Sequence, residues 1–284
     1  MLDKHLEIAS DCAEPISPYD DPDCRYVAMP EAMHTFAAPS LYDVTVEGDG
    51  RHVLAQLTQG LVDCLNGVGS SPVDLLQHDA ATVKFTRELL GTGEISILAD
   101  RSGQNVMVDE AVFTGVWHVQ ITQGGQLRQD YLETGTIPGI ILATAKNPGL
   151  KAELPQTFPT GLMNAPALLH ELSAKSDAFA AGREEIINLS LLPLSPEDNA
   201  FLVETLGLAG LSILSRGYGD CRISLTRFPH VWWVQYFNSG EQLILNTLEV
   251  TDMPQVALAA REDLEDTLER LQSISAELET VNET

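Results

Sequence analysis

One short segment gathers the side chains of this chain that are best suited to chemistry. Residues 215–222 read SRGYGDCR, and place two arginines, a tyrosine and a thiol around two glycines, as in a tight turn between strands. A neighbouring cation lowers the pKa of a thiol and raises its nucleophilicity. The segment therefore predicts either an activated cysteine or an ordinary turn, with these residues as candidates for contact with a partner: Arg216, Gly217, Tyr218, Gly219 and Cys221.

The aromatic segment that follows is suited to contact. Residues 231–237 read VWWVQYF, and alternate strand residues face opposite sides, so Trp232 and Trp233 cannot enter the same core. Trp117 is the counterpart of Trp232 in an internal repeat, whereas Trp233 has no tryptophan counterpart. We expect Trp232 and Trp117 in the core. Trp233 and Tyr236 then either contact a partner, or helices cover both faces of the sheet.

Known catalytic and metal-binding motifs are incomplete in this sequence. His170-Glu171 begins the zinc motif HExxH, but Ala174 stands where the second histidine belongs. Gly91-Thr92-Gly93 lacks the lysine of a phosphate-binding loop and follows a predicted helix. The chain has no nucleophile elbow and no dinucleotide-binding turn. We therefore expect a protein that is not an enzyme, with no catalytic residues, no bound metal and no cofactor.

The elements that position these residues occur twice. Residues 75–143 and 191–259 align at a spacing of 116, apart from a one-residue slip around the tryptophans. Each copy predicts helices and three strands joined by short turns, with a break in the middle strand at Gly115 or Pro229. Short turns favour antiparallel pairing. The expected fold class is therefore α+β, an internally duplicated unit of helices and a three-stranded antiparallel meander, related by a pseudo-two-fold axis.

Capping residues mark the helix boundaries. Asp79 and Ser195 precede equivalent helices, and residues 196–198 after the serine read PED, a strong start signal. Gly91 and Gly207 stand where these helices should end, because glycine commonly terminates a helix. We therefore expect one helix in each copy between these residues.

The remaining segments divide the chain into four parts. We expect an extended acidic N-terminal arm over residues 1–49, a first repeat over 50–146 and a proline-rich linker over 147–161. A second repeat covers residues 162–284. It ends in an added C-terminal helix, since the leucines between residues 262 and 278 share one helical face.

The charge of the chain excludes two classes of partner. The 41 acidic and 16 basic residues give a net charge of −25, whereas nucleic acids and anionic membranes attract basic surfaces. We therefore expect no nucleic-acid partner and no membrane partner. Residues 1–50 and 261–284 carry −15 of the charge. These ends are either solvated tails or, in the case of the arm, a docking segment for a basic partner.

The cysteines and the N-terminal sequence indicate a cytoplasmic location. Cys12, Cys24, Cys64 and Cys221 are spaced too irregularly for a disulfide framework or a zinc ribbon. The first residues lack the apolar core of a signal peptide, and no stretch approaches 18 apolar residues. We therefore expect reduced thiols.

Several segments are similar to one known family. The run ILSRGYGDCRI at residues 213–223 and the run VWWVQYFNS at 231–239 carry the similarity. In the rest of the chain GEISI at 93–97, GVW at 115–117 and GLMNAP at 161–166 fit the same pattern. On these residues the chain resembles the HupH/HyaF/HoxQ family of NiFe-hydrogenase expression and formation proteins.

The resemblance implies an accessory protein of uptake-hydrogenase maturation. Members of this family look like chaperones that hold the NiFe-hydrogenase small-subunit precursor in the cytoplasm until its iron–sulfur clusters are assembled. The resemblance also implies a thioredoxin-like companion maturation protein as a second partner. An acidic chain without a catalytic constellation agrees with this role, and its charge suits a precursor with a twin-arginine signal.

A second function class stays open at this point, namely an iron–sulfur, metal-handling or thiol-active assembly factor that uses Cys221. A cluster scaffold normally offers three or four thiolates within reach, and here only Cys221 lies in a motif. Replacing Cys221 with serine separates the two classes, because a chaperone should tolerate the change.

Overall fold

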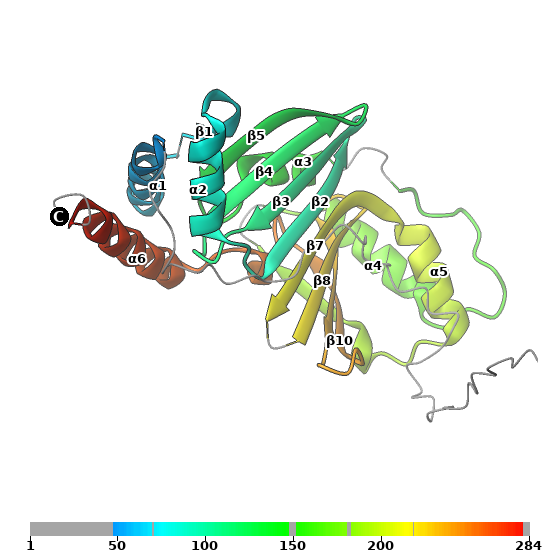
Figure 1. The fold of residues 1–284 in the computed structure, drawn as a ribbon. Coiled ribbons are helices and arrows are strands. Elements are labelled where there is room, and N and C mark those ends of the chain that lie inside the picture. Colours follow the sequence, from blue (N-terminus) through cyan, green and yellow to red (C-terminus); the bar gives the residue numbers. More distant parts are fainter. Residues whose placement is uncertain (1–47, 70, 148–151, 181–182, 218, 281–284) are drawn as a thin grey trace, which may run out of the picture.

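One ten-stranded antiparallel sheet organises the part of the chain that the computed structural model describes, residues 48–69, 71–147, 152–180, 183–217 and 219–280. The predicted acidic arm lies outside these residues except for its last two, and so do residues 148–151 of the predicted linker. The strands of the two predicted repeats form one continuous sheet (Figure 1).

From either edge of the sheet to its centre, the equivalent strands of the two halves follow in the same order. The full order runs β1-β5-β4-β3-β2-β7-β8-β9-β10-β6, so β2 and β7 meet at the centre and a short strand lies at each edge. The first half comprises β1 (Val73–Asp74), β2 (Ile95–Arg101), β3 (Gln104–Glu110), β4 (Val116–Gln123) and β5 (Gln126–Thr134). The second half comprises β6 (Glu185–Asn188), β7 (Leu208–Gly217), β8 (Gly219–Thr226), β9 (Val231–Phe237) and β10 (Leu243–Val250).

The helices form two groups. In Figure 1, α1, α2 and α6 lie together beside the strands of the first half, whereas α4 and α5 lie beside those of the second. None of the helices within the described ranges is both long and apolar enough to cross a bilayer. The helices are α1 (Gly50–Leu65), α2 (Ala80–Leu90), α3 (Gly139–Lys146), α4 (Ala165–Asp177), α5 (Pro196–Leu206) and α6 (Arg261–Thr280), with 3-10 turns η2 (Leu75–Gln77), η3 (Leu189–Leu191) and η4 (Gln255–Ala257).

The prediction of three strands in each meander is wrong, because each meander has four, β2 to β5 and β7 to β10. The middle strand predicted in each copy is two strands, β3 and β4 in the first half and β8 and β9 in the second. The chain reverses at Gly115 (φ +82°) and at His230 (φ +60°). The predicted breaks at Gly115 and Pro229 were therefore placed correctly, but each of them is a hairpin turn.

The predicted helix caps are confirmed. The Asp79 carboxylate accepts the Thr82 N–H at 2.7 Å, and α2 ends at Gly91 with φ +56°. Ser195 and Asp198 form a reciprocal capping box at the start of α5, which ends at Gly207.

Asp198 also joins two helices. Its carboxylate is fully buried and accepts the backbone N–H groups of Met163, Asn164 and Ala165 at the start of α4, in addition to that of Ser195. Burial raises the pKa of Asp198, but these N–H donors outweigh it and lower the pKa overall. The residue therefore fixes the start of α4 against the start of α5.

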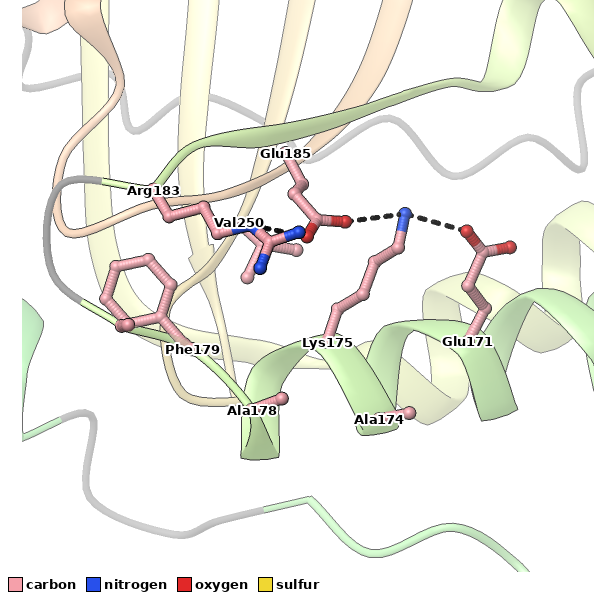
Figure 2. A pocket seen from close by; sticks show the side chains of 9 residues that line it. Glu171, Ala174, Lys175, Ala178, Phe179, Arg183, Glu185 and Val250 are labelled. Carbon is pink, nitrogen blue, oxygen red and sulfur yellow. Dashed lines mark ion pairs between the residues drawn. The ribbon is translucent and has the colours of Figure 1, made fainter.

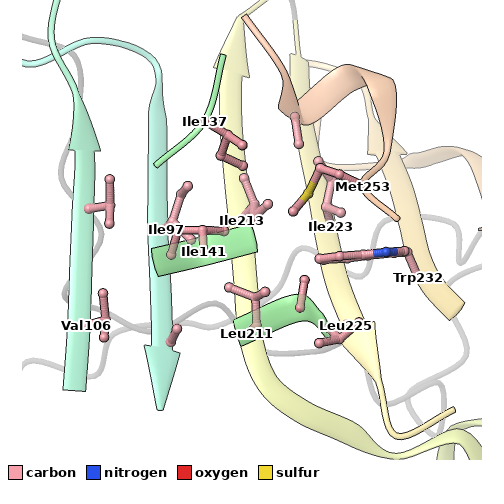
Figure 3. Packing of buried hydrophobic residues seen from close by; sticks show 14 of the residues in the cluster. Ile97, Val106, Ile137, Ile141, Leu211, Ile213, Ile223, Leu225, Trp232 and Met253 are labelled. Atoms are coloured by element: carbon pink, nitrogen blue, oxygen red, sulfur yellow. The ribbon is translucent and has the colours of Figure 1, made fainter. Parts of the chain in front are cut away.

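A single core crosses the centre of the sheet on one face. Ile97 of β2 and Ile213 of β7 are register partners, both fully buried, and Ile141 of α3 packs with them (Figure 3). Trp117 and Trp232 belong to the same core and are fully buried, as predicted. Their indole N–H groups donate to the carbonyls of residues 135 and 251, which are also 116 apart. We refer to this cluster as the seam core.

The other face of the sheet carries two separate cores. One packs α1, α2 and α6 on the first half, and the other packs α4 and α5 on the second half. Trp233 lies in the second of these, only 7% exposed, and its indole N–H donates to the Asn246 side chain. Of the two alternatives for Trp233, the structure therefore shows the one in which helices cover both faces of the sheet.

Candidate functional site

Cys221 and Tyr236 lie in a row of side chains that crosses the seam core. Tyr236 of β9 pairs with Cys221 of β8, Cys221 pairs with Ser215 of β7, and Ser215 pairs with Ile95 of β2. Opposite residues of paired strands face the same side. Glu110, the last residue of β3, continues the row beyond Ile95, and both line one cavity.

The Cys221 thiol is buried and held in its neutral form. The side chain is 5% exposed, and burial raises the pKa of the thiol to about 12. The Tyr236 hydroxyl hydrogen-bonds the thiol, which opposes this shift, while the nearby charge of Glu249 adds to it. Of the two alternatives for this segment, the burial and raised pKa of Cys221 therefore favour the ordinary turn over the prediction of an activated thiolate.

The arginines that motivated that prediction lie on the other side of the sheet. Strand alternation places Arg216 and Arg222 on the face opposite Cys221. The Arg222 guanidinium lies over the Phe237 ring, 4.3 Å from its centroid. Closeness along the sequence therefore did not bring the charges to the thiol, since successive strand residues point to opposite faces.

The glycines of the same segment shape the hairpin between β7 and β8. Gly217 pairs with Gly219, and Tyr218 lies outside the described residues. Gly219 has φ +128°, and a Cβ atom there would lie 2.4 Å from the Phe237 carbonyl oxygen. A side chain at Gly219 would therefore clash with the backbone of β9.

An acidic cavity of about 400 Å³ lies at the end of the row. It opens between the start of β2, the end of β3, η4 and the start of α6. Glu94 and Asp263 stand exposed at its rim, whereas Glu110 lies at its base. The Arg216 N–H donates to the Glu94 carbonyl at 3.0 Å, so the predicted hairpin borders this cavity. We refer to it as the acidic cavity.

Glu110 is the residue that sequence reasoning missed. It is 5% exposed, and its Oε1 accepts the Gly115 N–H at 3.0 Å. Burial raises the pKa of its carboxyl to about 7, and repulsion by Glu94 and Asp263 adds to this effect. A signal was present, because alternation puts Glu110 on the same face as the apolar residues Val106 and Val108.

In a second hollow, about 370 Å³ in volume, the carboxylates are paired with cations. Lys175 of α4 lies between Glu171 and Glu185, with Nζ to carboxylate distances of 2.7 and 3.0 Å (Figure 2). Arg183 lies 3.4 Å from Glu185. Each carboxylate in this hollow therefore has its own cation.

Asp130 is a buried carboxylate that is likewise compensated. It contacts Arg87 at 2.7 Å and His118 at 2.6 Å. Burial raises the pKa of Asp130, but His118 and Arg87 outweigh it and lower the pKa overall. Over the described ranges, no three side chains of His, Cys, Asp or Glu are grouped in a way that could hold a metal ion.

Comparisons with known proteins identify the relatives of this chain. A family model described as HupH hydrogenase expression protein, C-terminal conserved region, matches residues 49–149 and 162–278. The hydrogenase expression/formation protein HupH of Rhodobacter capsulatus is 41% identical over 261 residues, 90% of this chain and 92% of the relative. HoxQ of Cupriavidus necator, of the same description, is 37% identical over 92% of this chain and 93% of the relative.

Two further matches have lower coverage of this chain. The hydrogenase-1 operon protein HyaF of Escherichia coli K12 is 35% identical over 71% of either chain. A solved structure of the hydrogenase expression protein HupH from Thiobacillus denitrificans is 29% identical, with a TM-score of 0.38, and covers 40% of this chain and 96% of that one. The family match and the identities over most of the chain lead to one conclusion: this chain belongs to the HupH family of hydrogenase expression proteins.

Proposed function

We propose that this protein is an accessory factor in the maturation of a NiFe uptake hydrogenase. One observation carries the proposal: relatives about 40% identical over nine tenths of the chain are hydrogenase expression/formation proteins. Near-complete coverage of both chains supports a shared role, and the family model spans both halves of the sheet.

Within that role we propose a non-catalytic chaperone. It binds the small-subunit precursor in the cytoplasm until the iron–sulfur clusters are assembled, and it acts with a thioredoxin-like companion. The burial and raised pKa of the Cys221 thiol support this function over a thiol-active or cluster-handling factor, because a protonated, buried sulfur is a poor nucleophile and ligand. The net charge of −25 supports a basic partner segment.

The hairpin between β7 and β8 is our proposed contact with the partner. It carries Arg216, Gly217 and Gly219, and it borders the acidic cavity through the backbone contact to Glu94. Cys221 and Tyr236 support this hairpin from the seam core. A contact of Trp233 with the partner would require the second half to open, because this residue packs beneath α4 and α5.

We also propose that the two halves arose by internal duplication about a pseudo-two-fold axis at the seam. The mirrored strand order supports this, as does the pairing of Ile97 with Ile213, which lies 116 residues further along. The equivalent hydrogen bonds of Trp117 and Trp232 and the two segments matched by the family model agree with it. The predicted boundaries, 50–146 and 162–284, are part of this proposal.

A capture experiment tests the chaperone function. Affinity-tagged full-length protein is isolated from cells that express the hydrogenase operon, and the eluate is analysed by mass spectrometry and for iron. We expect the small-subunit precursor with its signal still attached, and no stoichiometric iron on the accessory protein after the partner is removed. Cells that lack the small-subunit gene are the control.

The Cys221→Ser variant separates the two function classes in the same experiment. A chaperone should capture the precursor as well as the wild type does, because the smaller hydroxyl can still hydrogen-bond Tyr236. Stoichiometric iron on the wild-type protein that disappears in Cys221→Ser would replace the chaperone with a cluster-handling factor.

A further inference from the structure

The carboxylate of Glu110 is buried without a compensating cation. Its side chain is 5% exposed, and no ion pair within the described part of the chain includes Glu110, Glu94 or Asp263. The Gly115 N–H bonds Oε1, whereas Oε2 accepts no hydrogen bond from the described residues and retains some solvent exposure. A buried charge is costly unless it is paired. The chain avoids this cost by raising the pKa of Glu110 to about 7, so that the carboxyl stays protonated at lower pH.

Three other acids of the fold show what compensation looks like. Asp130 contacts Arg87 and His118, Asp198 accepts four backbone N–H groups, and Glu185 contacts Lys175 and Arg183. Glu110 and Glu249 differ from these three acids, because the charged neighbours of Glu110 are Glu94 and Asp263 and that of Glu249 is Glu184. Of the two, Glu110 lines a cavity that carries further acids. A cation that pairs with the ionised carboxylate of Glu110 must therefore come from outside the described residues.

We propose that the acidic cavity is a binding site for one cationic side chain, a guanidinium or an ammonium group, presented by a basic segment of a partner protein. Glu110 receives the cation at the base of the cavity, and Glu94 and Asp263 attract it at the rim. This site deepens the proposed function and rests on it for the identity of the partner, but not for the binding chemistry.

The size and ligand geometry of the cavity favour a side chain over a bare ion. Its volume of about 400 Å³ far exceeds the roughly 30 Å³ of one water molecule. The three carboxylates do not converge as metal ligands, since no metal-holding group occurs in the described ranges. Apolar groups of Ile95, Val256 and Leu258 line the same walls, which suits the aliphatic stem of an arginine or lysine.

Two glycines shape the backbone around Glu110. The Gly93 N–H donates to the Glu110 carbonyl at 2.6 Å, and a Cβ atom at Gly93 would lie 2.4 Å from the Ala111 carbonyl oxygen. Gly115, with φ +82°, turns the chain so that its N–H reaches the Glu110 carboxylate. This N–H reports directly on the charge of Glu110.

The Gly115 amide therefore provides the test. The amide resonance of isotope-labelled full-length protein is followed across pH 5 to 9, alone and with saturating Nα-acetyl-arginine amide. A bound cation stabilises the carboxylate, so the midpoint of the titration should move to lower pH by about 1 to 3 units. Nα-acetyl-citrulline amide, which has the same shape without the charge, should leave the midpoint unchanged.

Three variants assign the effect to this cavity. Glu110→Gln should abolish the response, since glutamine can still accept the Gly115 N–H but carries no charge. Asp263→Asn lies at the exposed rim, where folding is insensitive, and should weaken binding of the arginine probe at least twofold. Glu171→Gln, in the charge-compensated hollow of Figure 2, is the matched control and should bind like the wild type.

Two results would overturn the proposal. One is an unchanged midpoint with the arginine probe, and the other is an equal response to the citrulline probe or in Glu110→Gln. Failure to capture the small-subunit precursor would instead count against the proposed function, because the titration uses the isolated protein and needs no partner.

Discussion

Ile97 and Ile213 face each other across β2 and β7, both fully buried, at the exact middle of the strand order. They belong to the seam core, which extends from Trp117 in one half to Trp232 in the other. The two halves are therefore not independent folding units joined by a linker. Each half completes the hydrophobic core of the other.

The seam pair should show thermodynamic coupling. Ile97→Ala and Ile213→Ala should each lower the free energy of unfolding by about 2–5 kcal/mol, because each leaves a cavity in a packed core. The double variant should depart from additivity by about 0.5–3 kcal/mol, since the two cavities merge. Denaturant unfolding measures all three, with Ile244→Ala, 62% exposed, as the control expected within about 0.5 kcal/mol. Strict additivity would mean that the seam does not couple the halves.

Glu110 should make the protein less stable as pH rises. Its carboxyl has a raised pKa of about 7 in the folded state against 4.5 as the ordinary value. Between these values the folded state holds a proton that the unfolded state has lost, so the free energy of unfolding falls as pH rises. The loss is at most about 3 kcal/mol and is complete above the folded pKa.

Glu110→Gln removes this pH dependence while keeping the hydrogen bond from Gly115. The difference in unfolding free energy between the variant and the wild type should therefore shift in favour of the variant from pH 5 to pH 8. Other titrating groups cancel in this difference. A difference that is the same at both pH values would mean that Glu110 ionises as an ordinary exposed carboxyl does.

The Cys221 thiol should resist alkylation in the native protein. It is buried and its pKa is raised to about 12, so almost no thiolate is available at neutral pH. Iodoacetamide labelling followed by peptide mass spectrometry should modify the partly exposed Cys64 first and Cys221 only after denaturation. Rapid labelling of Cys221 in the folded protein would instead support the interpretation of Cys221 as an activated thiol.

Trp233 should behave as a core residue. Trp233→Ala should lower the free energy of unfolding by about 3–5 kcal/mol, because it empties the core beneath α4 and α5. Trp233→Phe should cost less, since the phenyl ring still fills most of the space, although the hydrogen bond to Asn246 is lost. If both variants unfold like the wild type yet lose the captured precursor, Trp233 is a partner contact after all.

Asp198 should contribute more to stability than an ordinary helix cap. Asp198→Ala leaves unpaired the N–H groups at the start of α4 and the N–H of Ser195, the N-cap residue of α5, so the loss should exceed the about 2 kcal/mol upper limit for one N-cap. Asp79→Ala is the matched control, because Asp79 caps α2 alone. Equal losses measured by denaturant unfolding would show that the bonds to α4 contribute little.

The sequence by itself determined the local features of this protein. Ser195 and Asp79 were identifiable as caps because a capping side chain bonds an N–H only three residues away. The burial of Trp117 and Trp232 followed from their equivalent places in two similar segments. The family could be recognised for the same reason, since it is carried by continuous runs of residues.

The spacing of 116 residues holds only over part of the fold. Asp74 and Asn188, which cap η2 and η3 in the same way, are 114 residues apart. Two additional residues therefore precede α5 in the second half. An alignment at constant spacing does not detect this change, because Leu75 meets a leucine in either register, Leu189 or Leu191.

Only the tertiary structure decided the chemistry of the site. The charge state of Cys221 depends on which face of the strand its neighbours occupy, and alternation sends Arg222 to the far side. Whether Trp233 is exposed depends on α4 and α5, which come from a distant part of the chain. The acidic cavity depends on Glu94, Glu110 and Asp263, up to 169 residues apart in sequence, which meet only when β2, β3 and α6 are packed. Local patterns encode contacts a few residues apart, whereas burial and electrostatic environment are properties of the assembled sheet.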